Sequence, residues 1–196
     1  AVVGGDYDHI EQILSDLELD YDMFGPATYR DLLYDSQRLS EYDIVFFNCG
    51  MPFSWLESRT LVGNNLANFV SDGGSVYSSD WAHLIVEAAW PDKIDFYGDD
   101  DAFNDPTTSF DLTDSAYVGR ATNTNGEVLD QTMVMALGST SASIVYDLDA
   151  WVVPLAVGGG ASVMIQGSAP TWDIATGNPA TTYNNVPLAI RFDSGG

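Results

Sequence analysis

Residues 42–90 constrain the fold more than any other part of the sequence. A strand-like run at 42–47 is followed by Cys49, and a second run at 75–78 is followed by Asp80. A helix-like segment comes after each of them. Two parallel strands that each feed a helix bring these two side chains together at the carboxyl edge of one sheet. Open α/β folds bind their ligands at that edge, so the sequence predicts a site there.

Strand-like and helix-like segments alternate through the first 90 residues. In the first helix, Ile10, Ile13, Leu14 and Leu17 recur at helical spacing, and Asp8 is placed to cap it. This order predicts a mainly parallel sheet with helices on both faces. The expected strands are 1–3, 21–24, 43–48 and 75–78, and the expected helices are 8–17, 29–39, 54–70 and 81–90.

The sequence changes character after Trp90. Residues 91–131 read as a long polar insertion, and the chain beyond them is expected to be β-rich, with Gly158–Gly160 as a hairpin turn. The expected strands are 132–137, 144–148, 152–157, 162–166 and 187–192. We expect residues 1–196 to form a single domain, and to be a piece of a longer protein because the sequence does not begin with Met.

The charge of the chain is strongly negative. Six Lys and Arg stand against 29 Asp and Glu, a formal net charge of −23. Such a surface repels phosphate backbones and anionic lipids, so we expect neither nucleic acid nor a membrane as a partner. The longest apolar runs are also far too short to span a bilayer.

Two environments are consistent with this acidity. One is the cytoplasm of a halophile, where salt screens dense surface charge. The other is an extracellular, cell-surface or periplasmic location, where carboxylates bind calcium. The richness in Asp, Asn, Gly, Ser and Thr favours an exported protein. The single cysteine excludes an internal disulfide.

Four segments resemble a known family. They are Val2-Val3-Gly4-Gly5 with His9 close behind, Tyr42-Asp43-Ile44-Val45-Phe46-Phe47-Asn48-Cys49-Gly50, Phe69-Val70-Ser71-Asp72-Gly73-Gly74-Ser75-Val76-Tyr77, and Val186-Pro187-Leu188-Ala189-Ile190-Arg191-Phe192. Together they resemble the class I glutamine amidotransferase-like superfamily, particularly its trehalose-utilisation (ThuA-like) and related exported branches. The resemblance covers roughly residues 1–90, extends only loosely over the remainder, and implies a three-layer α/β sandwich of flavodoxin-like type.

The chain departs from that family at its nucleophile. Active members carry Gly-x-Cys-x-Gly at a strand-to-helix turn, whereas this chain has Ser78-Ser79-Asp80-Trp81-Ala82. Asp80 therefore takes the place of the thiol, and a carboxylate is a poor nucleophile towards amides. The family's later His-x-Glu pair is also missing, since no histidine follows His83. The resemblance therefore implies a fold without glutaminase activity.

Each candidate site residue also has a structural interpretation. Cys49 is either a thiol activated by His9 or a small buried side chain. Asp80 is either a reactive or ligand-binding carboxylate, or a helix cap. Trp81, together with Trp55, is either an aromatic platform for a sugar or a packing residue. The expected ligand edge comprises Gly5, Asp6, Cys49, Gly50, Ser79, Asp80 and Trp81.

One acidic segment is the candidate for a metal. Asp99, Asp101 and Asp105 lie close together in the polar insertion, and carboxylate oxygens are the ligands that Ca²⁺ prefers. The segment lacks the register of an EF-hand loop, so a solvated acidic loop is the alternative. No other cofactor is expected.

The leading functional interpretation is a catalytically degenerate amidotransferase-like domain in an exported protein. It would act as a binding or scaffolding module for a small molecule, a carbohydrate or a protein. A hydrolase that uses Cys49 or Asp80 with a histidine is one alternative, and a purely structural module is the other. The expectation leans away from an enzyme.

Overall fold

The computed structural model describes residues 1–51, 58–98, 118–173 and 175–194. Within these residues the chain divides into two compact units. Residues 1–90 with Ser194 form the N-terminal unit, and residues 91–193 form the C-terminal unit. The prediction of one domain over the whole chain stays a prediction, and each unit is described by itself.

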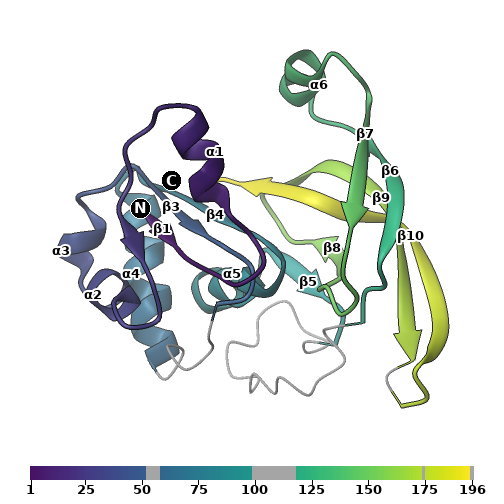
Figure 1. Cartoon of the computed structure of the whole chain (residues 1–196), viewed down its shortest axis with the longest axis horizontal. Coiled ribbons are helices and arrows are strands. Elements are labelled where there is room, and N and C mark those ends of the chain that lie inside the picture. The colour runs from purple at the N-terminus through teal and green to yellow at the C-terminus, as the bar shows by residue number, and fades with distance from the viewer. Residues whose placement is uncertain (52–57, 99–117, 174, 195–196) are drawn as a thin grey trace. The chain divides into compact units, whose positions relative to one another are not determined.

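The N-terminal unit is built on a parallel sheet of four strands in the order β2-β1-β3-β4 (Figure 1). This confirms the predicted parallel α/β arrangement. The strands are β1 (Val2–Val3), β2 (Met23–Phe24), β3 (Ile44–Phe47) and β4 (Ser75–Ser78). The helices are α1 (Ile10–Asp16), α2 (Tyr29–Leu33), α3 (Ser36–Leu39), α4 (Arg59–Ser71) and α5 (His83–Ala89).

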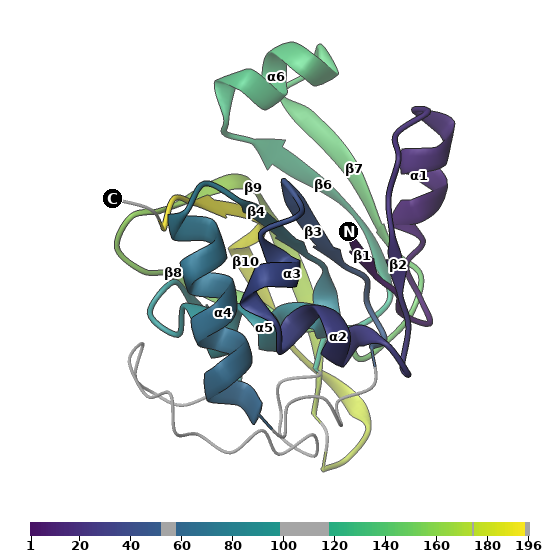
Figure 2. The same ribbon diagram turned by 90° about the vertical axis from the view of Figure 1, so that its left-hand side faces the viewer.

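The two faces of this sheet are covered unequally. Right-handed crossovers from β1 to β2 and from β3 to β4 run in opposite directions, so they place α1 and α4 on opposite faces. In Figure 2, α1 and α4 lie on opposite sides of the strands. Val45 and Phe47 are fully buried, whereas Ile44 and Tyr77 on the alternate positions are exposed. One face is therefore closely packed, and the face of α1 is only partly covered.

Some predicted helices differ in detail from the observed ones. The predicted helix 29–39 is two short helices, because the Asp35 carboxylate caps the N-terminus of α3 and interrupts the run. The first helix begins at Ile10, and Asp8 does not cap it. The predicted helix 81–90 opens with a 3₁₀ turn, Asp80–Ala82, before α5.

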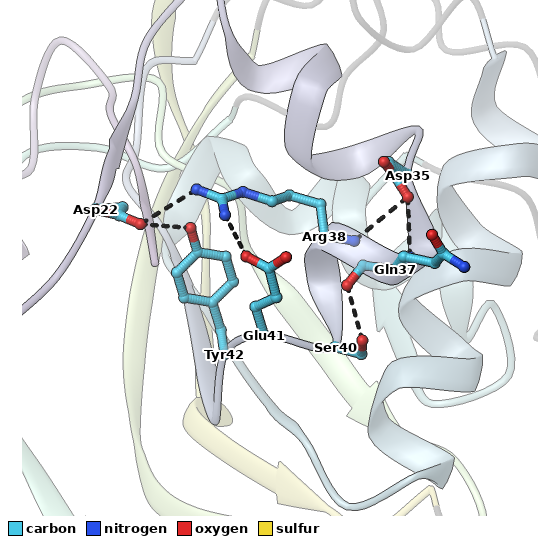
Figure 3. A network of polar contacts seen from close by, with 7 residues as sticks. All are labelled: Asp22, Asp35, Gln37, Arg38, Ser40, Glu41 and Tyr42. Carbon is cyan, nitrogen blue, oxygen red and sulfur yellow. Dashed lines mark hydrogen bonds and ion pairs between the residues drawn. The ribbon is translucent and has the colours of Figure 1, made fainter.

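A polar network joins the strand β2 to the start of β3 (Figure 3). Asp22 accepts hydrogen bonds from the Tyr42 hydroxyl at 2.6 Å and from Arg38 at 3.3 Å, and Arg38 also pairs with Glu41. Burial of the phenol, helped by the hydrogen bond to Asp22, raises the pKa of Tyr42 to about 12. Arg38, on α3, is therefore paired with two acidic side chains.

The C-terminal unit contains two antiparallel sheets (Figure 1). One has the order β10-β9-β6-β7 and the other pairs β5 with β8. The core of the unit surrounds Trp151, which stacks on Tyr146 at 4.0 Å between ring centroids. The strands are β5 (Ile94–Phe96), β6 (Thr122–Val128), β7 (Ser141–Tyr146), β8 (Pro154–Val157), β9 (Ala161–Asp173) and β10 (Asn178–Phe192).

Three predictions for the C-terminal unit are wrong. The predicted strand 132–137 is the helix α6 (Gln131–Leu137), because Asp130 caps its start and Gly138, at a φ of 64°, ends it. Residues 122–128, placed in the polar insertion, form the strand β6. Gly158–Gly160 is no hairpin turn, since it connects strands that belong to different sheets.

No helix among the described residues combines the length and the apolar character needed to cross a bilayer.

Candidate functional site

Three strand ends define the candidate site. Val3, Phe47 and Ser78 occupy one line across the sheet, since Val3 pairs with Phe47 and Phe47 with Ser78. The segments that follow β1, β3 and β4 therefore leave the sheet at the same carboxyl edge, as predicted from the sequence. A polar groove at the opposite, amino end of β3 and β4 is lined in part by Asp43 and Asn65.

Two glycines let the segments at this edge approach each other. A Cβ on Gly5 would lie 2.0 Å from the Cys49 carbonyl oxygen, so no other residue fits there without a shift of the backbone. Gly50 has a φ of 86°, and a Cβ on it would lie 2.6 Å from the Tyr7 ring. The Tyr7 N–H donates to the Cys49 carbonyl at 3.2 Å, which fixes the segment after β1 against the end of β3.

Cys49 and Asp80 are brought together, as the sequence predicted. The Cys49 thiol lies 3.4 Å from the Asp80 carboxylate and is buried, with 4% of the residue exposed. Burial and then the negative charge of Asp80 raise the pKa of Cys49 to about 12. The thiol is therefore protonated near neutral pH, and only the thiolate is a nucleophile.

Asp80 has an unusual backbone. Its φ is 39°, a left-handed conformation that residues other than Gly, Asn and Asp rarely adopt. It sits between a strand and a helical turn, where such strain marks functional positions more often than others. Its side chain is exposed, and Ser79 rather than Asp80 stands at the N-cap of the 3₁₀ turn.

Asp8 is a member of the site that the sequence did not reveal. Its carboxylate accepts hydrogen bonds from the Cys49 N–H at 3.2 Å and from the Ser79 hydroxyl. It thus links the segments after β1, β3 and β4. The Asp6-Tyr7-Asp8 sequence after a strand is the available signal, but the spacing of Asp8 and Glu11 equally fits a helix cap.

His9 is paired with a carboxylate of the first helix. Its Nδ1 lies 2.9 Å from Glu11, which in turn accepts a hydrogen bond from Asn48 at 2.9 Å. Burial opposes ionisation of Glu11, but hydrogen bonds from its own backbone, Asn48 and His9 outweigh this and lower its pKa. The observed partner of His9 is thus Glu11 of α1, and its pairing with Cys49 stays a prediction.

His83 lies beneath the edge and is buried. Burial lowers its pKa to about 4, against the opposing influence of the Asp80 and Trp81 backbone. The imidazole is therefore neutral near neutral pH. A buried, neutral imidazole at the start of α5 serves as a packing residue.

An aromatic pair flanks the acidic edge. The rings of Tyr7 and Trp81 meet edge to face, with centroids 5.5 Å apart and an interplanar angle of 81°. Tyr7 is half exposed and Trp81 is partly buried, so the pair presents apolar surface beside Asp80. Trp55, the other half of the predicted platform, lies outside the described residues.

The predicted metal site cannot be placed, because Asp99, Asp101 and Asp105 lie outside the described residues. Among the residues that are described, no three side chains of the metal-binding types gather closely enough to hold an ion. Three carboxylates of the described residues lie at the candidate edge: Asp6 and Asp80 are exposed and Asp8 is partly buried. The edge therefore presents acceptors to a ligand.

Comparison with known proteins gives no relative. No protein-family model matches the chain, and neither the curated proteins nor the solved structures contain a significant match.

Proposed function

We propose that the N-terminal unit is a catalytically degenerate α/β domain of amidotransferase-like type, with a flavodoxin-like arrangement, whose strand edge binds a ligand. The observation that carries this proposal is Asp80, an exposed carboxylate at a φ of 39° in the strand-to-helix turn. The protein is proposed to be exported and to use this unit as a binding or scaffolding module.

The chemistry of the edge supports binding over reaction. The nearest sulfur nucleophile, Cys49, is protonated and buried, and His9 is paired with Glu11. A thiol hydrolase needs a thiolate and a base in contact with it.

The ligand is proposed to be rich in hydrogen-bond donors. Asp6, Asp8 and Asp80 supply acceptors, and an anionic ligand would be repelled by the same carboxylates. The adjacent Tyr7 and Trp81 rings suit the C–H face of a sugar or an ammonium group. An oligosaccharide or an amino sugar fits both features.

The proposal is tested by titrating the isotope-labelled protein with neutral gluco-oligosaccharides and with chitosan oligomers while its amide chemical shifts are recorded. We expect amide chemical shifts to change at Gly5, Gly50 and Asp80 for at least one probe. Asp80→Asn, which keeps a side chain tolerant of positive φ, should abolish these changes. Asp43→Asn, an exposed acid at the other end of β3, is the matched control and should leave them unaltered. Equal responses in both variants, or no response to any probe, would contradict the proposal.

A further inference from the structure

Apolar side chains at the end of the first helix are left uncovered. Leu14 is the buried residue of α1, whereas Ile13 is 54% exposed. Two leucines just beyond the helix are also exposed, Leu17 by 63% and Leu19 by 53%. Residues at such spacing normally pack against a sheet or a second helix. Here they form a surface, which we call the α1 patch and define as Ile13, Leu17 and Leu19.

The rim of the α1 patch is acidic and has no nearby free cation. Residues 16–20 alternate acid and leucine, and all five are exposed. Lys and Arg are absent from the first 29 residues of the sequence. The next cation after Arg30 is Arg38, which is already paired with Asp22 and Glu41 (Figure 3). Within the described part of the N-terminal unit, the sequence around the patch therefore supplies acids and no Lys or Arg.

The backbone holds the patch in a defined shape. The Leu19 N–H donates to the Leu14 carbonyl at 2.9 Å, and the Glu18 N–H donates to the Ser15 carbonyl at 3.0 Å. This is a Schellman end, in which Glu18, at a φ of 55°, stands where glycine is usual. A surface already ordered in this way loses little conformational entropy when a partner binds.

Charge decides which partner fits this surface. A second copy of a chain with a net charge of −23 would bring like charges together around the patch. Anionic lipid surfaces are repelled for the same reason. A segment with apolar side chains on one face and Lys or Arg beside them satisfies both the leucines and the acidic rim.

We propose that the α1 patch binds a cationic amphipathic segment of another protein. Ile13 and Leu17 supply the apolar contact, while Asp16, Glu18 and Asp20 pair with the cations. This surface is separate from the proposed ligand at Asp80, so either proposal can fail without the other.

Binding of a fluorescent amphipathic peptide of leucine and lysine tests the proposal. We expect Leu17→Gln to weaken binding by at least roughly tenfold, because it removes an apolar contact from the centre of the patch. Leu61→Gln changes an exposed leucine on α4 and should leave the affinity unchanged. Neutralising Asp16 and Asp20 to Asn should reduce the salt dependence of binding.

The same variants distinguish binding at the α1 patch from non-specific attraction of a cationic peptide to an acidic protein. Equal affinity of Leu17→Gln and the unaltered protein would overturn the proposal, as would equal affinity for a peptide of leucine and glutamate. A dimer in sedimentation equilibrium that Leu17→Gln dissociates would also overturn it, since a second copy would then be the occupant. Unchanged melting temperatures of the variants show that binding, rather than folding, is measured.

Discussion

Gly63→Ala is expected to destabilise the N-terminal unit by about 3 kcal/mol, although helix propensity alone predicts the opposite sign. Gly63 lies inside α4, where alanine is normally favoured over glycine by about 1 kcal/mol. A Cβ at this position would lie 2.0 Å from the Ala88 carbonyl oxygen, which belongs to α5. The contact is with backbone, so a side-chain rotation cannot relieve it, and the two helices must separate.

Urea unfolding of Gly63→Ala beside two control variants measures this effect. Thr60→Ala lies exposed on the same helix and should be stabilising by a few tenths of a kcal/mol through propensity alone. Gly25→Ala places its Cβ where no atom lies within 4 Å and should be close to neutral. Stabilisation of Gly63→Ala would show that α4 and α5 do not pack as closely as described.

Lowering the pH is expected to lower the free energy of unfolding, because the folded protein buries the His83 imidazole in its neutral form. The pKa of His83 is lowered from 6.5 to about 4 in the folded protein. Between these two values the unfolded chain binds a proton that the folded chain does not, so stability falls as the pH falls through this window. The full loss is on the order of 3 kcal/mol and is complete below the folded pKa.

His83→Gln isolates this contribution from the many carboxylates that titrate in the same range. Protonation of the carboxylates affects both proteins alike, so it cancels in the difference between their unfolding free energies. We expect the unaltered protein to lose roughly 2 to 3 kcal/mol more than His83→Gln between about pH 7 and pH 4.5. Parallel pH profiles for the two proteins would contradict a buried, neutral imidazole.

The parallel sheet was predictable because its signals are local. Short apolar runs, each ended by a turn and followed by a helical pattern, give the order of strands and helices along the chain. Strands connected through helices run parallel, so their carboxyl ends meet at one edge of the sheet, which is why Cys49 and Asp80 could be expected as neighbours.

The first helix was predicted, but its exposure to solvent could not be predicted in the same way. The spacing of Ile13 and Leu17 indicates a helix, but it does not say whether a neighbour covers that side. Because α1 lies on the opposite face from α4, the packing that buries the other helices leaves it exposed. Burial therefore depended on the topology rather than on the helical pattern.

The error at residues 131–137 has a different cause. An apolar run with Val134 read as a strand, whereas Asp130 and Gly138 hold the two ends of a helix. That helix has no buried residue, and Met135 is 76% exposed, so its caps rather than its packing fix it. The role of Asp8 was missed because its partners, Cys49 and Ser79, are distant in the sequence.

The pH dependence of thiol labelling at Cys49 tests the central claim most directly, because an edge that binds without reacting is expected to lack an activated thiolate. With iodoacetamide, the rate in the folded protein should still be rising at about pH 10, consistent with a pKa of about 12. Asp80→Asn removes the charge beside the thiol, so the labelling rate should begin to rise at a lower pH. The access of the reagent to the buried sulfur should stay the same. A labelling rate that reaches a plateau near neutral pH would mean an activated thiolate, and would contradict the account.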